Sequence, residues 1–303
     1  MNDSGRFTEK HPFVSVIVPV KDMAETIGIC IESLLALDYP GDRYEIIIVD
    51  NGSMDGSRDI ALKYPVKVLD EAKPGSYAAR NRGIKESRGE YIAFTDADCR
   101  VTPAWLTNMV KAFRGHRTWC VAGRISPVHG NTVAERWQAS NNILSNEKAV
   151  SERTYIKPYA MTANAMFPRF VFDKVGLFDE SSPSTCDAEM GWRIYDMDME
   201  VKYAPKAVVY HRHRINVKGV WKQFFRYGMG NAALFKRHRA GRKVRVDIND
   251  KLSLLKAVVK IFTYPWPRRE DVGRWAPVLD AVRNAAFVSG KIVGSIRYRV
   301  LVI

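Results

Sequence analysis

Residues 91–98 read Tyr91-Ile-Ala-Phe-Thr-Asp-Ala-Asp98, an apolar run of strand length that ends in two carboxylates. Two earlier runs share this form: Phe13-Val-Ser-Val-Ile-Val-Pro19 comes before Lys21-Asp22, and Tyr44-Glu-Ile-Ile-Ile-Val49 comes before Asp50-Asn51. Near-continuous apolar strands of this length predict a mainly parallel sheet that is covered on both faces. Ligands of such sheets bind beyond the carboxyl ends of the strands, which is where all three polar clusters fall.

The segments between these strands have the apolar spacing of helices. From Thr26 to Leu37, apolar side chains recur at three- and four-residue steps, which predicts a helix with one buried face. A third strand is predicted at 66–69, and Thr102-Pro103 is interpreted as the cap of a helix that ends near Phe113. The remaining predicted elements are helices over 57–64, 76–87, 132–146 and 186–196, a strand over 201–210, and basic helices from residue 221 onward.

Length and composition exclude several classes of protein. The 303 residues, with a mass of 34.4 kDa, suit one large domain or two small ones. Apolar residues make up 46% and charged residues 26%, which excludes disorder, collagen-like repeats and a disulfide-stapled miniprotein. No apolar run approaches the ~18–20 residues that span a bilayer, and the polar start 1–10 predicts no secretory signal. The four cysteines form no CxxC pair, so a reduced, cytoplasmic chain is expected.

Charge is divided unevenly along the chain. Residues 1–200 hold 24 Lys and Arg against 28 Asp and Glu, whereas residues 201–303 hold 23 against 5, a net charge of +18. Such asymmetry indicates that the basic part meets an anionic surface, either lipid headgroups or nucleic acid. The stretch 251–269 mixes apolar and basic residues, and its Tyr264 and Trp266 suit a membrane interface. Helices that pack against the core and carry lysines on their solvent-exposed face would show the same pattern.

Three polar segments could carry chemistry, and each has a plainer alternative. Asp96-Ala-Asp98 offers the paired oxygen ligands that Mg²⁺ and Mn²⁺ prefer, although a solvated turn has the same sequence. Asp50-Asn-Gly52 is either turn chemistry or a carboxylate that accepts a hydrogen bond from a nucleobase. Lys73-Pro-Gly75 leads into a helix whose first N–H groups, with Lys73 and Arg80 nearby, would suit a diphosphate. The alternative for this last segment is an exposed basic helix.

The order of these and later segments resembles the family 2 glycosyltransferases, which have the GT-A nucleotide-sugar-binding fold. The resemblance covers about residues 13–213. The segments that carry it are VSVIVPVKD, IIIVDNGSMDGS, PGSYAARNRGI, GEYIAFTDADC, TANAMFPRFVFDKVGLFDE, CDAEMGWRI and APKAVVYHRH.

The family implies an α/β GT-A fold, with a mostly parallel central sheet flanked by helices and a basic helical C-terminal extension. The expected catalytic domain is 1–215, with nucleotide-sugar binding at about 13–125 and the acceptor and catalytic part at about 126–215. The basic helical region would then be 216–303, with a possible membrane association.

The resemblance also implies roles for particular positions on the donor side. Asp50 resembles the residue that recognises the nucleotide base, and Pro19, Lys21 and Asp22 would line the same pocket. Arg80 resembles the basic residue near the nucleotide, and Lys73 is expected beside the diphosphate. The implied donor is a nucleotide sugar, expected to be UDP-linked.

Metal binding is implied at three positions. Asp96 and Asp98 resemble the DxD pair, with Asp98 on the metal and Asp96 towards the ribose or the metal. His211 resembles a histidine that completes the metal site in many GT-A enzymes, whereas a lone histidine after a strand is more often a satisfied surface residue. The implied cofactor is Mn²⁺ or Mg²⁺.

Cys186-Asp187-Ala-Glu189 matches the segment in which family members often have Glu-Asp, and the aspartate there is the catalytic base. Asp187 is therefore the expected base, and Glu189 is the alternative. Cys186 departs from the family pattern. The reaction implied is an inverting transfer in which this carboxylate removes the acceptor hydroxyl proton. The expected acceptor is a glycan or a lipid-linked sugar in surface polysaccharide or glycolipid synthesis, reached from the cytoplasmic face of the membrane.

Two other classes of protein share parts of this pattern. A sugar-phosphate nucleotidyltransferase shares a similar α/β layout, but the stretch 18–25 lacks the glycine-rich loop expected after the first strand. A nucleic-acid-binding protein could use the basic C-terminal third, but no recognised binding motif supports it, so no nucleic-acid partner is expected.

Overall fold

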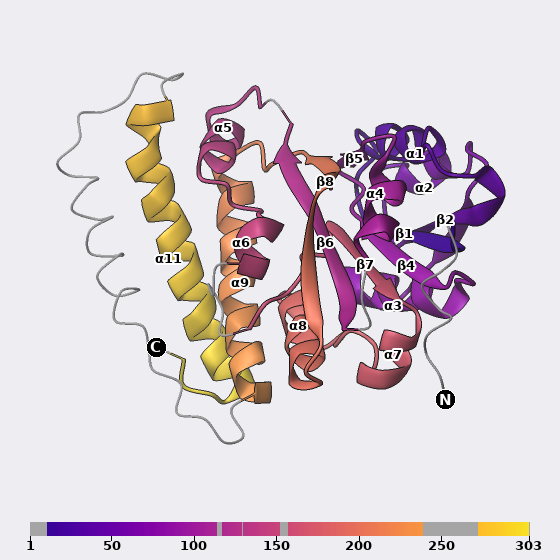
Figure 1. Cartoon of the computed structure of the whole chain (residues 1–303). Coiled ribbons are helices and arrows are strands. Elements are labelled where there is room, and N and C mark those ends of the chain that lie inside the picture. Colours follow the sequence, from indigo (N-terminus) through magenta and orange to yellow (C-terminus); the bar gives the residue numbers. More distant parts are fainter. Residues whose placement is uncertain (1–10, 114–116, 129, 152–156, 239–271, 303) are drawn as a thin grey trace. The chain divides into compact units, whose positions relative to one another are not determined.

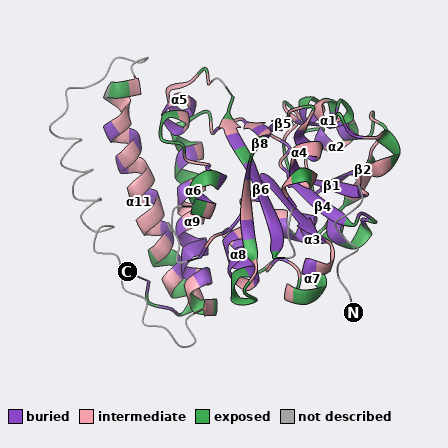
Figure 2. Cartoon of the chain, viewed as in Figure 1, coloured by how far each residue is buried: buried purple, intermediate pink, exposed green. Residues whose placement is uncertain are grey.

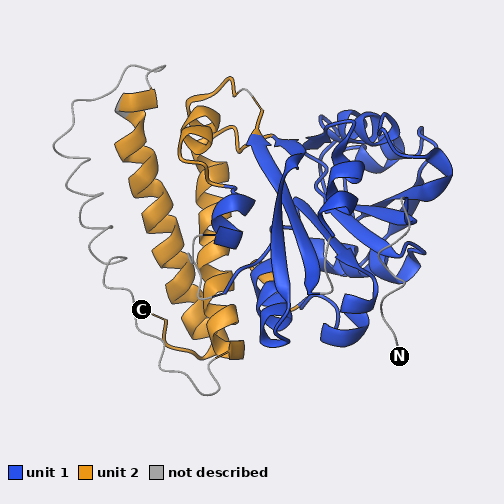
Figure 3. Cartoon of the chain, in the orientation of Figure 1, with its two compact units in different colours: residues 1–126, 144–180, 187–211 blue, residues 127–143, 181–186, 212–303 orange. Residues whose placement is uncertain are grey.

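The computed structural model describes residues 11–113, 117–128, 130–151, 157–238 and 272–302. The chain divides into two compact units (Figure 3). Unit 1 comprises residues 1–126, 144–180 and 187–211, and unit 2 comprises 127–143, 181–186 and 212–303. The predicted division at residue 215 stays a prediction, and the sequence did not suggest that two earlier segments would group with the C-terminal third.

Unit 1 is a mixed α/β unit built on an eight-stranded sheet with flanking helices (Figure 1). The strand order is β3-β2-β1-β4-β7-β6-β8-β5. Strands β1 to β4 pair in parallel, as the sequence predicted, whereas β4–β7, β6–β7 and β5–β8 pair antiparallel. The strands are β1 (Val14–Val20), β2 (Tyr44–Asp50), β3 (Lys67–Asp70), β4 (Tyr91–Thr95), β5 (Cys99–Val101), β6 (Thr118–Pro127), β7 (Asn164–Pro168) and β8 (Glu200–His211).

Helices connect these strands. They are α1 (Ile27–Leu35), α2 (Ser57–Ala61), α3 (Ser76–Glu86), α4 (Trp105–Ala112), α6 (Asn146–Ser151), α7 (Phe170–Val175) and α8 (Cys186–Asp196). Helices α1 to α4 and α8 lie close to predicted positions, whereas α6 and α7 were not predicted. All seven residues of β1 are buried, and the sheet strands are largely buried in Figure 2. Two-sided burial explains why the strands read as near-continuous apolar runs.

Alternate side chains of β1 serve opposite faces of the sheet. Val16 and Val18 join a buried cluster with Ile31 of α1. Ile17 faces α3, where Gly83 permits a close approach, since a Cβ atom at Gly83 would lie 2.5 Å from Ile17 Cγ2. The helix therefore sits directly on the strand, and its first turn lies beside the strand ends at which the polar clusters gather.

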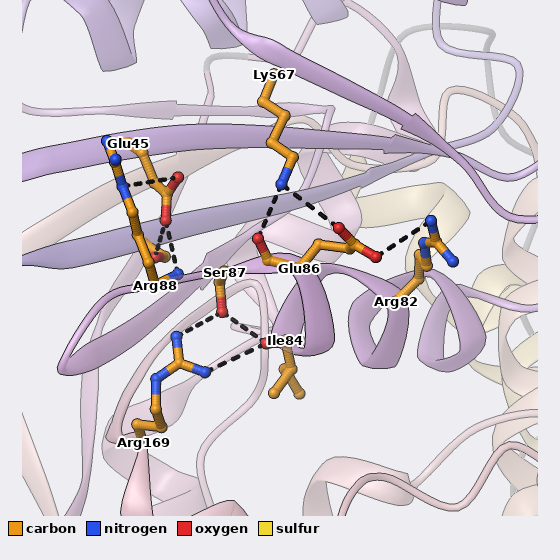
Figure 4. Close-up of polar contacts among 9 residues, drawn as sticks. Glu45, Lys67, Arg82, Ile84, Glu86, Ser87, Arg88 and Arg169 are labelled. Carbon is orange, nitrogen blue, oxygen red and sulfur yellow. Dashed lines mark hydrogen bonds and ion pairs between the residues drawn. The ribbon is translucent and has the colours of Figure 1, made fainter.

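The C-terminal end of α3 is held by hydrogen bonds from Arg169, which follows β7 (Figure 4). Its guanidinium donates to Ser87 Oγ at 2.9 Å and to Gly89 O at 2.7 Å, and a longer bond of 3.4 Å reaches Ile84 O. A cation that binds the last carbonyls of a helix satisfies acceptors that have no partner within the helix. Burial lowers the pKa of Arg169, and its contacts hold α3 rigidly to the sheet.

Two predictions of local structure were wrong. Thr102 does not cap α4, whose N-cap is Ala104; Thr102 instead bonds to Val208 O through its backbone N–H at 3.1 Å and its hydroxyl at 3.2 Å. The helix predicted over 132–146 ends early: α5 covers Val133–Ser140, the chain turns at Asn142, whose φ is 48°, and a separate helix, α6, begins only at Asn146. Asn adopts this left-handed conformation more readily than most residues.

Unit 2 packs α5, α9 (Val217–His238) and α11 (Val272–Tyr298) around one cluster. Trp137 of α5, Phe224 of α9 and Leu279 of α11 are buried in it. Helices α9 and α11 approach closely at paired glycines, since a Cβ atom at Gly228 would lie 2.1 Å from Phe287 O, and one at Gly290 would lie 2.1 Å from Phe225 O.

The described helices include none with the length and apolarity that crossing a bilayer requires. The basic stretch 251–269, with Tyr264 and Trp266, lies outside the described residues. Helical structure was predicted from residue 221 onward, and α9 and α11 confirm it for the described part of that region.

Candidate active site

The two carboxylates of the DxD segment lie in a tight turn between β4 and β5. The Cys99 N–H donates to Asp96 O at 3.0 Å, which closes the turn around residues 96–99. Burial raises the pKa of the Cys99 thiol well above its usual value. A carboxylate oxygen such as that of Asp98 is the ligand type that Mg²⁺ and Mn²⁺ prefer.

His211 reaches this turn through strand register. Strand β5 pairs antiparallel with β8, and Cys99 lies opposite His211, the last residue of β8. As a result, His211 Nε2 is 3.4 Å from Asp98 Oδ1, and both side chains are more than nine-tenths buried. Ligand atoms of Asp98, Cys99 and His211 all lie within 4.8 Å of one another. The structure thus brings together two of the predicted metal ligands.

Asp96, the third predicted ligand, contacts an arginine. Arg80 Nη2 of α3 lies 2.5 Å from Asp96 Oδ1, and the Arg80 side chain is 5% exposed while that of Asp96 is 29% exposed. The guanidinium also lies over the Tyr77 ring, 5.3 Å from its centroid. Arg80 is thus a buried cation beside the DxD turn, rather than part of an exposed basic helix.

Asp50 is the last residue of β2, and its two carboxylate oxygens differ in their hydrogen bonding. Oδ2 accepts from the backbone N–H groups of Gly52 and Ser53, both at 3.0 Å, which is the turn role considered from the sequence. Oδ1 is buried and has no hydrogen-bond partner among the described residues. A buried acceptor without a partner is costly, so this oxygen is suited to a ligand N–H.

Hydrogen bonds connect the loops that follow β1 and β2, next to Asp50. Val20 of β1 lies opposite Asp50 in parallel register, so the two strands end together. Lys21 Nζ donates to Asn51 O at 3.1 Å and to Gly52 O at 2.9 Å, and Asp22 Oδ1 accepts from Met54 N at 2.8 Å. The sequence predicted that these polar clusters would share one edge of the sheet, and the structure confirms it. Pro19 is buried within β1, one residue before the strand ends.

Lys73 lies on the loop that precedes α3. Its ammonium is 2.6 Å from the Glu180 carboxylate, which raises the pKa of Lys73 and lowers that of Glu180. Asn51 fixes the backbone of the same loop, because its Nδ2 donates to Glu71 O and Lys73 O and its Oδ1 accepts from Gly75 N. The loop therefore holds its shape without a ligand.

Asp187 lies in the first turn of α8 and accepts two hydrogen bonds. Tyr77 donates its hydroxyl to Oδ1 at 3.0 Å, and the Thr162 N–H donates to Oδ2 at 3.4 Å. Although part of its surface is accessible, desolvation raises the pKa of Asp187, and the charge of Arg80 and the bond from Tyr77 oppose that rise. A carboxylate with a raised pKa is a stronger base than an ordinary aspartate.

Glu189, the alternative base, is buried and engaged elsewhere. Arg193, one turn further along α8, binds it through Nε at 3.0 Å and Nη2 at 2.8 Å. The same guanidinium donates to backbone carbonyls of residues 175–177. These contacts give Glu189 a role in fixing α8 to the preceding loop, and they favour Asp187 as the base.

Tyr77 and Glu180 were not expected in this site, and Asn51 was expected in a polar cluster but without its contacts to the loop at Lys73. The sequence contains a signal for Tyr77, since it lies three residues before Arg80 and residues three apart on a helix share a face. The contacts of Asn51 could not be predicted because an Asn-Gly pair is typical of a turn. The contact of Glu180 could not be predicted because Glu180 is far from Lys73 along the chain.

Comparison with known proteins places the chain in a family. A sequence model of glycosyl transferase family 2 matches residues 15–176. Glycosyltransferase AglE of Haloferax volcanii is 33% identical over 231 residues, which cover 74% of this chain and 74% of that protein. The pre-mycofactocin glycosyltransferase of Mycobacterium tuberculosis is 28% identical over 75% of this chain, which spans about half of that relative (48%).

Two solved structures share the fold. A mannosyltransferase of Pyrobaculum calidifontis, in complex with GDP-mannose and Mn²⁺, has a TM-score of 0.67 at 19% identity and covers 95% of this chain and 88% of its own. S. aureus TarS with UDP-GlcNAc has a TM-score of 0.54 at 17% identity and covers 95% and 91%. These likenesses confirm the predicted GT-A-like α/β fold, and the sequence matches show that the chain belongs to glycosyl transferase family 2.

Proposed function

We propose that this glycosyltransferase is a metal-dependent, inverting enzyme that moves a sugar from a nucleotide diphosphate to a hydroxyl group. The observation that carries the proposal is that unit 1 contains a set of polar residues at strand ends, in the DxD turn and on two helices. Asp50 and His211 end β2 and β8, and Asp98 lies in the DxD turn. Arg80 lies on α3, and Asp187 lies in the first turn of α8. These residues supply a base-recognition acceptor, a cation, two metal ligands and a general base.

The residues at the DxD turn fit a divalent cation. Carboxylate oxygen and imidazole nitrogen suit Mn²⁺, and the Asp98 and His211 atoms are close enough to bind one ion. Asp98 and His211 would hold the metal, with Asp96 towards the donor. A bound divalent cation would stabilise the negative charge of the diphosphate leaving group.

The chain's own residues account for the remaining steps. Asp50 Oδ1 accepts a hydrogen bond from the base, and the loop at Lys73 and the first turn of α3 offer a cation and N–H groups to the diphosphate. Asp187 removes the proton from the acceptor hydroxyl on the face opposite the leaving group. A single displacement of this kind inverts the anomeric carbon.

The donor proposed is UDP-linked, as the family resemblance implies. The structural neighbours bind GDP-mannose and UDP-GlcNAc, which supports a nucleotide sugar and makes a GDP-sugar the alternative. The acceptor proposed is a glycan or lipid-linked sugar in surface polysaccharide or glycolipid synthesis.

We also propose that the enzyme works as a peripheral protein at the cytoplasmic face of an anionic membrane. All four charged residues from 281 to 303 are basic, namely Arg283, Lys291, Arg297 and Arg299. Exposed aliphatic side chains lie among them, namely Ile292, Val293, Ile296 and Leu301. Interleaved aliphatic and basic side chains suit a headgroup interface.

One experiment tests the catalytic proposal. Release of nucleoside diphosphate is measured across UDP-, GDP- and dTDP-sugars, in Mn²⁺, in Mg²⁺ and in EDTA, with and without polyprenyl-linked acceptors. We expect one donor class to be turned over, with a metal requirement and a product of inverted anomeric configuration. Full activity in EDTA or a retained configuration would contradict the proposal.

A further inference from the structure

Helix α3 carries two residues that touch the active-site carboxylates. Tyr77 and Arg80 are three residues apart and share one helix face. The Tyr77 hydroxyl donates to Asp187 Oδ1 at 3.0 Å, and Arg80 binds Asp96 while lying over the Tyr77 ring. We propose that Tyr77 is a positioning residue for the general base: its hydroxyl holds the Asp187 carboxylate in one orientation and favours its ionised form. The inference rests on the proposed role of Asp187.

Tyr77 is itself held in place on two sides. Its side chain is buried, and its ring packs against Phe178 at a centroid distance of 5.6 Å. Phe178 is fixed in turn by Asn81, whose side chain bonds the Phe178 N–H at 3.0 Å and its carbonyl at 2.9 Å. A phenol confined in this way cannot follow a moving carboxylate, so the carboxylate must adapt to the phenol.

Each oxygen of Asp187 has a separate partner. Tyr77 binds Oδ1, and the Thr162 N–H binds Oδ2 through a longer bond of 3.4 Å. Among the described residues, Arg80 is the charged group whose field acts on Asp187 from α3, and on α8 itself Glu189 is engaged with Arg193. The shorter of the two hydrogen bonds therefore comes from Tyr77, and it stabilises the charged form.

Helix α3 also fixes the separation between the DxD turn and the general base. Arg80 contacts the DxD turn, on the leaving-group side, and Tyr77 contacts the base, on the acceptor side. In-line displacement requires these two sides to keep a fixed separation, because small misplacements of reacting groups lower the rate steeply. A rigid helix that touches both sides provides it.

The test is Tyr77→Phe, which keeps the ring and removes the hydroxyl. Loss of one hydrogen bond to the carboxylate should move the acidic limb of the kcat profile to higher pH by about one pH unit. At neutral pH we expect kcat to fall about tenfold while the donor KM changes less than about twofold, because the bond acts on the base and not on the donor. The rate measured is nucleoside diphosphate release from UDP-glucose, UDP-GlcNAc or GDP-mannose, whichever the wild type uses fastest.

Tyr39→Phe is the matched control. Tyr39 is equally buried in unit 1, and its hydroxyl donates to Pro12 O at 2.6 Å, away from the site. This variant should lose stability without any shift of the pH profile. Thermal unfolding of both variants shows whether they fold.

Two outcomes separate this inference from the function on which it rests. If Asp187→Asn keeps wild-type turnover, the base assignment fails. If Asp187→Asn is inactive while folded Tyr77→Phe keeps the wild-type pH profile and kcat, the positioning role alone is overturned.

Discussion

Arg80 and Asp96 form an ion pair at 2.5 Å in which the guanidinium is almost fully buried. The pair joins α3 to the turn that carries both DxD carboxylates. Because the arginine is held before any donor arrives, a diphosphate would meet a preorganised cation, which costs less free energy than ordering a flexible side chain on binding.

Asp98→Asn and His211→Ala should each lower turnover by at least about 100-fold, because charge stabilisation by a bound metal is worth several kcal/mol. They should also raise the Mn²⁺ concentration needed for half-maximal rate. The measurement is a Mn²⁺ titration of nucleoside diphosphate release. Cys99→Ala is the control and should keep the wild-type titration. A Cys99→Ala titration as weak as that of Asp98→Asn would make the thiol a ligand.

Asp50→Asn should raise the donor KM by about tenfold or more, because an amide N–H in place of Oδ1 would confront the base with a donor where an acceptor is needed. The value of kcat should change less. Asp70→Asn is a close control, since Asp70 lies opposite Asp50 in the register of β2 and β3 but is an exposed partner of Arg58. Equal effects of the two substitutions on KM would contradict a base-recognition role.

Asp187→Asn should lower kcat by about two to four orders of magnitude while leaving the donor KM within a few-fold, since a general base acts on the acceptor proton in the transition state. Glu189→Gln should instead lower stability, because Arg193 loses a charged partner. Steady-state kinetics and thermal unfolding measure the two effects. If folded Glu189→Gln is inactive and Asp187→Asn is active, the base is Glu189.

The same Asp187→Asn variant should be at least as stable as the wild type near neutral pH. The pKa of Asp187 is raised in the folded state, so its ionised form costs folding free energy at every pH above the ordinary aspartate value. That cost should shrink as the pH falls through the raised pKa, and the amide removes it. The check is the difference in free energy of unfolding between wild type and variant across acidic and neutral pH. A variant that is less stable at neutral pH would contradict the desolvation of Asp187.

Much of unit 1 could be predicted from the sequence because strands that are buried on both faces of a sheet appear as near-continuous apolar runs. Residues 14–20 and 44–50 are strands in the structure because nearly every side chain is apolar, and the polar residues that follow must then share one edge. Local chemistry was harder to predict. Thr102 looked like a helix cap, but a hydrogen bond to β8 competes for it, and no local pattern reveals that partner.

The parts of the candidate site that could not be predicted depend on contacts between residues far apart in the sequence. His211 meets Asp98 only because β5 and β8 pair in one particular register. Tyr77 meets Asp187, 110 residues away, through tertiary packing. The sequence offered Asp187 and Glu189 as alternative bases, and their contacts distinguish them: Arg193 binds Glu189, whereas Tyr77 binds Asp187.

The last prediction concerns the C-terminal part of α11 and the residues after it. If exposed Ile296 and Leu301 enter the headgroup region beside Arg297 and Arg299, the double substitution Ile296→Glu/Leu301→Glu should weaken vesicle binding at least about tenfold. Two aliphatic contacts are lost, and two negative charges now face an anionic surface. Co-sedimentation with phosphatidylglycerol-containing vesicles, at low and high salt, measures the effect. Ile29→Glu is the control, because Ile29 is exposed on α1 of unit 1, outside the basic region. Wild-type binding that is equal on neutral and anionic vesicles, or absent from both, would contradict the proposed binding to an anionic membrane.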